Sequence, residues 1–194
     1  MTQFLLRMLL LNSHFRLFEN FNFREVNGMS ELTEKNLAYA FAAESKAAVR
    51  NEAFARKAEA EGYRQIARLF RAISEAESVH ARRYLQFMRG KIGSTEENLE
   101  TAFNNEINAN VNEYPKLIKD ATDEGKESIA KAFSRSRDVE SGHADLYKKA
   151  MNDMLAERET DYYVCQVCGF VAEDEPSDNC PVCGAVKSKF KKMA

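Results

Sequence analysis

The sequence predicts a mainly α protein, in which a four-helix bundle is followed by a small metal-binding module of strands and loops. Glycine (8) and proline (3) are scarce among 194 residues and alanine is abundant, which favours long helices over strands. The motif Glu-x-x-His occurs twice, and each copy follows another glutamate by roughly one helix length. All four cysteines fall near the carboxyl terminus as two Cys-x-x-Cys pairs. The domains we expect are an extension over 1–28, the bundle over 29–157 and the metal module over 158–194.

The extension differs from the rest of the chain. Its apolar run is interrupted by Arg7 and is too short to span a bilayer, and no small-x-small cleavage site follows. Met29 opens a stretch that is typical of a protein start. We therefore expect translation to begin at Met29, and the alternative is an amphipathic anchor helix. The intact mass of the native protein separates the two.

Four helices are expected after the extension. They cover Thr33–Glu61, Tyr63–Arg89, Ser94 to about Gly125, and Lys126–Glu157. Glycine just past a helix is the usual stop signal, and Ser94-Thr-Glu-Glu97 has the pattern of a capping box.

Each helix carries a stripe with steps of three and four residues, which predicts one buried face. In the second helix the stripe is Ile66, Phe70, Ile73, Glu77, His80, Tyr84 and Phe87, and in the third it is Leu99, Phe103, Glu106, Asn110, Glu113 and Leu117. The first and fourth helices place Glu44, Glu140 and His143 in the same way. Glutamate and histidine therefore stand where a bundle core needs apolar residues.

These inward residues predict a carboxylate-bridged two-metal site in the bundle. The candidate ligands are Glu44, Glu77, His80, Glu106, Glu140 and His143. Four buried carboxylates repel one another, and two divalent cations offset their charge. A single Glu-x-x-His is usually an exposed pair, but two copies in the same register favour metal binding. Oxygen-rich ligands with two imidazoles suit iron or manganese better than zinc.

The two cysteine pairs predict a four-thiolate metal site. Its ligands are Cys165, Cys168, Cys180 and Cys183. A single iron would make the module a one-electron carrier, whereas zinc would make it a structural clip. Tyr163, Phe170 and Phe190 are expected to form its small core. Cysteines at metal-ligand spacing indicate a reducing compartment, which we take to be the cytoplasm. The net charge of −2 gives no sign of a nucleic-acid or membrane partner.

Over residues 29–194 the chain resembles the rubrerythrins, in which a ferritin-like bundle is fused to a rubredoxin-like module. The matching segments are Ala40–Ser45, both Glu-x-x-His motifs, Glu106 with Tyr114-Pro115, and both cysteine knuckles. The resemblance implies a di-iron peroxidase that reduces hydrogen peroxide to water. Electrons would come from NAD(P)H through a reductase and the Fe(Cys)4 centre. It also implies Tyr114 as a catalytic residue beside the carboxylates, although a core tyrosine with one hydrogen bond is the alternative.

Two positions depart from the pattern of that family. Ala109 stands where a second glutamate usually follows the one matching Glu106, and Asn51 stands where tyrosine is frequent. Alanine cannot bind metal, which favours an alternative function, an O2-reactive ferroxidase or oxidase that handles iron. Glu113 lies about 10 Å along the helix from Glu106 and is an unlikely substitute. A pure electron carrier with a structural bundle is a third hypothesis, which the inward ligands oppose.

The connection between the second and third helices bears on assembly. A ferritin-like bundle needs a crossover there of about 30 Å, given the helix lengths on either side of the ligands. Lys91–Gly93 with flanking residues spans about 17 Å when fully extended. Either the helix ends unwind or two chains exchange helix pairs, so we expect a domain-swapped homodimer. A dimer would also bring the cysteine module of one chain near the di-iron site of its partner.

Overall fold

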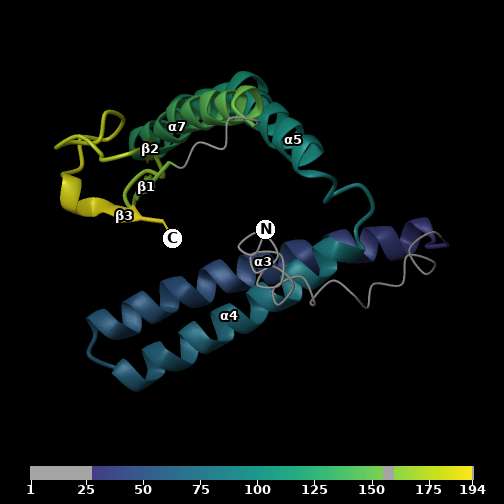
Figure 1. The fold of residues 1–194 in the computed structure, drawn as a ribbon. Helices are drawn as coiled ribbons and strands as arrows, with labels where there is room; N and C mark the ends of the chain where they lie inside the picture. Colours follow the sequence, from purple (N-terminus) through teal and green to yellow (C-terminus); the bar gives the residue numbers. More distant parts are fainter. Residues whose placement is uncertain (1–27, 155–159, 194) are drawn as a thin grey trace, which may run out of the picture. The chain divides into compact units, whose positions relative to one another are not determined.

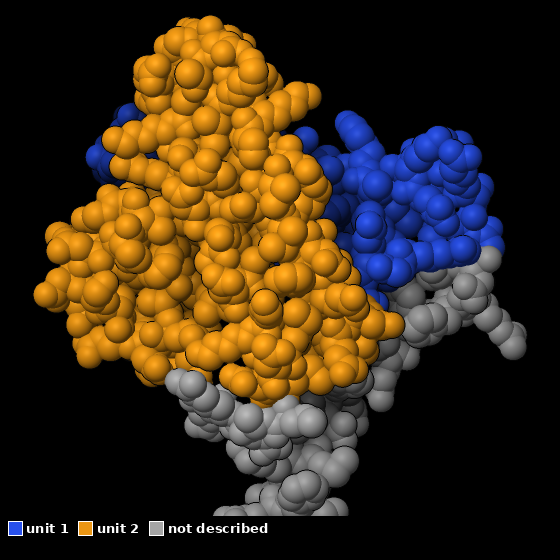
Figure 2. Space-filling view, turned by 90° about the horizontal axis from the view of Figure 1, so that it is seen from above, with its two compact units in different colours: residues 1–92 blue, residues 93–194 orange. Residues whose placement is uncertain are grey.

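The computed structural model describes residues 28–154 and 160–193. The chain forms two compact units, which divide after residue 92, inside the predicted bundle (Figure 2). All of the predicted extension except Gly28 lies outside the described residues, so the start at Met29 stays a prediction. Within the described part of the chain, no helix has the length and apolar character needed to cross a bilayer.

The first unit is a helical hairpin of α3 (Glu31–Ala60) and α4 (Arg64–Phe87), which lie side by side (Figure 1). Ser30 caps α3, because its hydroxyl accepts a hydrogen bond from the Thr33 amide at 3.3 Å. Gly62 turns the chain in the left-handed region with φ +86°. The predicted bounds of both helices are confirmed to within two residues.

Small side chains form the contact between α3 and α4. Its buried residues are Ala48, Ala55 and Ala58 on α3 and Ala67 and Ala81 on α4. Beside them Phe54 and Phe70 pack edge to face, with ring centroids 5.5 Å apart. Alanines let the helices approach closely but bury little apolar surface, so the larger side chains of the pair are left near the surface.

The second unit begins with α5 (Thr95–Asn108), π-helix η1 (Ala109–Glu113), α6 (Tyr114–Asp123) and α7 (Glu127–Asn152). Both α5 and α6 pack against α7. The capping box is confirmed, since Ser94 and Glu97 each bond the other's backbone amide. The third helix was expected to be regular, and the π-helix interrupts it.

The π-helix moves the inward face of the third helix by one residue. The Tyr114 amide donates to the Ala109 carbonyl, five residues back, so the segment holds one extra residue per turn. Pro115 explains this locally, because it has no N–H and its ring would collide with the carbonyl four residues earlier. The prediction that Glu113 and Leu117 face inward is therefore wrong: both are exposed, and Tyr114 takes the inward position.

A three-stranded antiparallel sheet completes the second unit. Its strands are β1 (Tyr162–Cys165), β2 (Val171–Glu173) and β3 (Phe190–Lys192), in the order β2-β1-β3, with a short 3₁₀ helix η2 (Lys187–Lys189) before β3. Phe170 and Phe190 pack edge to face with centroids 6.4 Å apart, and Tyr163 lies under the Lys192 ammonium at 5.8 Å. The predicted aromatic core of the module is thus present, although these rings are half-buried.

Candidate metal centres

The hairpin of the first unit brings three of the predicted ligands together. Glu44 comes from α3, and Glu77 and His80 come from α4. His80 Nδ1 lies 3.0 Å from Glu77 Oε2 and 3.8 Å from Glu44 Oε1. We call this group the α3–α4 cluster. The spacing of three residues on α4 places its carboxylate and imidazole on the same side of the helix.

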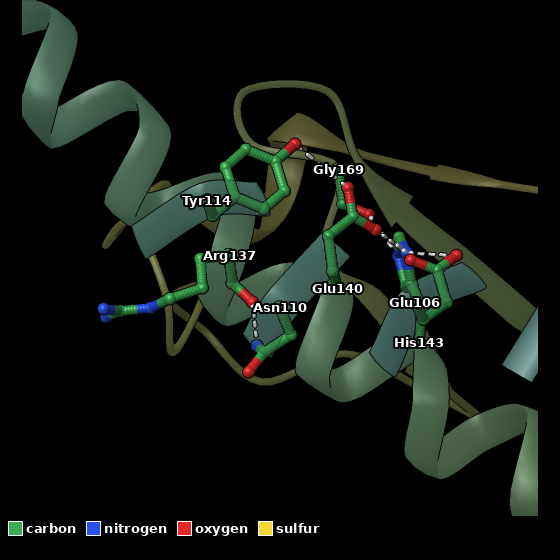
Figure 3. A network of polar contacts seen from close by, with 7 residues as sticks. All are labelled: Glu106, Asn110, Tyr114, Arg137, Glu140, His143 and Gly169. Atoms are coloured by element: carbon green, nitrogen blue, oxygen red, sulfur yellow. Dashed lines mark hydrogen bonds and ion pairs between the residues drawn. The ribbon is translucent and has the colours of Figure 1, made fainter. Parts of the chain in front are cut away.

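The second unit contains a matching group, the α5–α7 cluster (Figure 3). Glu106 comes from α5, and Glu140 and His143 come from α7. His143 Nδ1 lies 3.0 Å from Glu140 Oε2 and 3.8 Å from Glu106 Oε1. The two clusters have the same composition and the same distances, so each unit carries one three-ligand half of the predicted set.

The ligands are less buried than the sequence predicted. Side-chain exposure lies between 19% and 27% for the four glutamates and is 24% for His143, whereas His80 is 53% exposed. No charged residue in the described part of the chain is fully buried. Desolvation, with the hydrogen bond and charge of Glu140, still raises the pKa of Glu106 to about 7. A cation between these groups would remove that penalty.

The donor atoms fit a di-iron centre. Four carboxylates and two imidazoles are the ligand list of ferritin-like two-metal sites, and each set of three donor atoms lies within 4.8 Å of one another. In both histidines Nδ1 faces the carboxylates, so this nitrogen is the one available to a metal. Hard oxygen donors combined with imidazole match iron.

Tyr114 lies beside the α5–α7 cluster, where its hydroxyl donates to Glu140 Oε1 at 3.4 Å (Figure 3). Burial raises the pKa of Tyr114, and the negative charges of Glu140 and Glu106 raise it further. A hydrogen bond with Ser136 acts in the opposite direction but does not cancel these effects. The phenol therefore stays protonated and able to donate at neutral pH. The expected proximity to the carboxylates is confirmed.

Asn110 is a supporting residue that the sequence did not identify in this role. Its side-chain amide donates to the Arg137 carbonyl of α7 at 2.8 Å, which ties the π-helix to α7 (Figure 3). Ala109 opens the same π-helix and presents no ligand atom. Glu113 is exposed and accepts a hydrogen bond from Asn108, so it does not substitute for the missing carboxylate. Asn51 bonds the Ala47 carbonyl of its own helix.

The four cysteines meet in a second candidate centre. Their sulfurs form one group, with Cys165 3.7 Å from Cys183 and Cys168 3.6 Å from Cys180. A tetrahedron with metal–sulfur bonds of about 2.3 Å has sulfurs about 3.8 Å apart, so the site is already formed for a metal. Gly169 and Gly184 take left-handed conformations with φ +87° and +74°, as the knuckles require.

The surroundings of the four cysteines act on their thiols in two directions. Burial raises the pKa of Cys168 and Cys183. Burial acts in the same direction on Cys165, but hydrogen bonds from the Val167 and Cys168 amides lower its pKa overall. Amide groups aimed at sulfur stabilise a thiolate, and a bound cation keeps the remaining thiols deprotonated. The set fits the single iron of a rubredoxin-like centre.

The cysteine module contacts the α5–α7 cluster directly. His143 Nε2 lies 3.3 Å from the carbonyl oxygen of Gly169, the residue after Cys168 (Figure 3). Such a second partner fixes the tautomer of a metal-binding histidine and leaves Nδ1 free for the metal. Lys149 of α7 also pairs with Glu173 of β2. The module thus lies against α7 of its own chain, and its expected approach to the di-iron site of a partner chain stays a prediction.

Comparison with known families agrees with this architecture. The Rubrerythrin family profile matches residues 35–151 and, in a second match, residues 97–172. The profile described as "Rubrerythrin, rubredoxin-like domain" matches residues 163–191. The first profile thus matches the helices, and the second matches the cysteine module that follows them in the chain.

Similar proteins extend over most of the chain. Nigerythrin of Nitratidesulfovibrio vulgaris is 33% identical over 81% of this chain and 85% of its own length. Rubrerythrin of Porphyromonas gingivalis is 33% identical over 83% of this chain and 90% of its own. A solved structure of partially reduced nigerythrin is 32% identical with a TM-score of 0.51, covering 83% of this chain and 86% of that one.

Proposed function

Because the chain belongs to the rubrerythrin family, we propose that it reduces hydrogen peroxide to water at a di-iron centre, with electrons supplied through its four-cysteine iron. The chain is thus an oxidoreductase of oxidative-stress defence, and peroxide is the substrate that we infer. Reduction of one peroxide to two waters consumes two electrons and two protons. A site for this reaction needs a route for electrons as well as a place for peroxide.

The observation that carries the proposal is the contact between His143 and Gly169. It joins the cysteine module to the α5–α7 cluster through one hydrogen bond of 3.3 Å beside Cys168. An iron-storage protein has no need of an electron carrier held against one of its ligands. The contact therefore favours an enzyme that is re-reduced in each turnover.

We assign the bundle irons to the six clustered side chains and the single iron to the four thiolates. The bundle ligands are Glu44, Glu77, His80, Glu106, Glu140 and His143, and the thiolates are Cys165, Cys168, Cys180 and Cys183. When bound, ferrous iron supplies the electrons that cleave the O–O bond. Tyr114 acts as a positioning residue, since its hydroxyl orients the Glu140 carboxylate and carries a proton close to the reacting oxygens.

The electron donor and the compartment are part of the same proposal. An NAD(P)H-dependent reductase, acting on the cysteine centre, would supply electrons in single steps. Four free cysteines arranged for a metal support a reducing compartment, which we take to be the cytoplasm. We also propose that the working form is a homodimer.

The second candidate function is oxidation of Fe(II) by O2. Ala109 favours it, because the residue three positions after Glu106 cannot act as an exchanging ligand. The two functions differ in the oxidant that the reduced protein prefers.

Stopped-flow oxidation of the fully reduced protein tests this choice. We expect hydrogen peroxide to oxidise it at least about tenfold faster than O2 at equal concentration. An O2 rate equal to or above the peroxide rate would replace the peroxidase proposal with the ferroxidase one. Ala109→Glu should raise the preference for peroxide, whereas Ala109→Gln, of similar size but a poor ligand, should leave it unchanged.

A further inference from the structure

We propose that Asn110 is a positioning residue, which fixes the register of the π-helix η1 and thereby holds the Tyr114 hydroxyl at Glu140. Asn110 acts on the α5–α7 cluster through Tyr114. Its effect on the peroxide reaction rests on the proposed function, whereas the placement of Tyr114 can be measured without that reaction.

The register of the π-helix decides which side chain faces the α5–α7 cluster. In a regular α-helix each residue turns the chain by about 100°, so Tyr114, eight residues after Glu106, would lie about 80° away from it around the axis. Glu113 would lie within about 20° of Glu106 instead. The extra residue held by η1 brings Tyr114 back toward α7, where it donates to Glu140 Oε1 at 3.4 Å, and Glu113 is left exposed. A change of register would therefore take a phenol away from the cluster and bring a carboxylate toward it.

Pro115 makes a break in the regular helix necessary but does not select the form of that break. Its ring and its missing N–H are compatible with a simple kink as well as with a π-helix. A kink would bend α6 away from the line of α5 and carry Tyr114 with it. The contacts made by η1 itself must therefore decide between the two forms.

Two side-chain hydrogen bonds stabilise the π-helix, and the first lies on its outer side. There Asn108 Nδ2 donates to Glu113 Oε1 at 2.7 Å. Residues five apart lie about 140° from one another around a regular α-helix, so this bond fits only the wider turn. Both residues are exposed, however, and water competes for their hydrogen bonds, which limits what the outer bond contributes.

The second bond belongs to Asn110 and reaches a neighbouring helix. Asn110 is half-buried, and its Nδ2 donates to the Arg137 carbonyl oxygen of α7 at 2.8 Å (Figure 3). Arg137 lies one residue after Ser136 and three before Glu140. Those two residues are the hydrogen-bond partners of the Tyr114 hydroxyl. Asn110 and Tyr114 thus bond the same turn of α7, so the Asn110 bond sets the distance of η1 from that turn and, with it, the position of the phenol.

Loss of the Asn110 bond leaves no unpaired acceptor on α7. The Arg137 carbonyl lies within that helix, where one lone pair accepts the bond of the helix itself and the other accepts from Asn110. A variant without the amide donor is therefore expected to keep its helices and to lose the register of η1.

Asn110→Leu tests the proposal, because leucine keeps the branched shape of asparagine and donates no hydrogen bond. Asn110→Ala is a second variant, which removes the donor without adding apolar volume. The matched control is Asn51→Leu, the same change at a half-buried asparagine whose amide donates to the Ala47 carbonyl of its own helix at 3.0 Å.

Fluorine NMR reads the position of Tyr114 in the full chain, labelled with 3-fluorotyrosine and loaded with diamagnetic zinc in place of iron. The Tyr114 resonance is the one that Tyr114→Phe removes from the spectrum. In both Asn110 variants we expect it to move toward the resonances of the exposed Tyr39 and Tyr63, and in Asn51→Leu we expect it to stay in place. A Tyr114 resonance that stays in place in both Asn110 variants would overturn the proposal. Loss of the helical circular dichroism signal in both would overturn it too, because Asn110 would then be required for the fold as a whole.

Single-turnover oxidation of the reduced, iron-loaded protein by hydrogen peroxide gives a second measurement. Asn110→Leu should slow the reaction several-fold, as Tyr114→Phe does, and the double variant should be no slower than Tyr114→Phe alone, since both changes remove the same contact. A double variant slowed by the product of the two separate effects would show that Asn110 acts by another route and would refute the positioning role. A parent protein that does not react with peroxide would refute the proposed function, while the fluorine resonance would still decide the role of Asn110.

Discussion

Removal of metal should make the protein lose stability as pH rises, and Glu106 is the residue responsible. In the folded, metal-free chain, burial and the neighbouring Glu140 raise the pKa of Glu106 from 4.5 to about 7. The folded state therefore binds this proton more tightly than the unfolded state does. The stability that the proton contributes is present at low pH and is lost as pH rises through 7.

The magnitude follows from the two pKa values. Between pH 5 and pH 8 the linkage relation gives a loss of about 2.5 kcal/mol for this one group. The Glu106 side chain is 19% exposed, so solvent screens part of the effect and we expect about 2 kcal/mol. In the iron-loaded protein the carboxylate is neutralised by metal, and this decline should disappear.

Urea unfolding followed by circular dichroism, at pH 5, 6, 7 and 8, measures the effect on metal-free and iron-loaded protein. Glu106→Gln is the matched control, because the amide keeps the size of the side chain and does not titrate. The metal-free variant should show little change over this range. Equal slopes for the parent and the variant, or a metal-free parent as stable at pH 8 as at pH 5, would refute the reasoning.

Three further results are expected. Tyr114→Phe removes a long hydrogen bond to Glu140, so we expect the free energy of unfolding in urea to fall by less than about 1 kcal/mol. The peroxide reaction in single turnover should become several-fold slower, and an unchanged rate would contradict the positioning role. Cys168→Ser should abolish the red ferric-thiolate absorption and steady-state turnover while bundle iron, measured by metal analysis, is kept. Lys149→Met breaks the partly exposed ion pair with Glu173, which holds the cysteine module against α7 and is worth up to about 1 kcal/mol. Electron transfer from the cysteine centre should therefore slow by up to about fivefold, with no loss of iron. A loss of iron as large as the loss of rate would argue that the pair does not act by holding the module in place.

Helix bounds and the residues of the two clusters were accessible from the sequence because both depend on local patterns. Gly62 and Gly125 adopt left-handed conformations just after their helices, as expected of stop signals. The repeated Glu-x-x-His motif identified both clusters because a helix places residues three apart on one side.

The π-helix was not accessible in the same way. One extra residue between Glu106 and Tyr114 changes the inward face without a sign in the hydrophobic pattern, which continued regularly through Glu113 and Leu117. Pro115 was the available local signal, but proline at this position is equally compatible with the first turn of a new helix. The apolar pattern could also not reveal that the chain divides after residue 92, since each stripe shows which face is covered but not which helix covers it.

The hydrogen-bond acceptor facing His143 is a main-chain oxygen, and this affects how the link between the two metal centres can change. A side chain that made this link could be lost by one substitution, whereas a peptide carbonyl persists whatever residue follows Cys168. What a substitution can alter is the local conformation, and φ +87° at Gly169 strongly restricts the residues that fit. A substitution can therefore break this contact by changing the conformation of the loop, but not by replacing the atom that makes it.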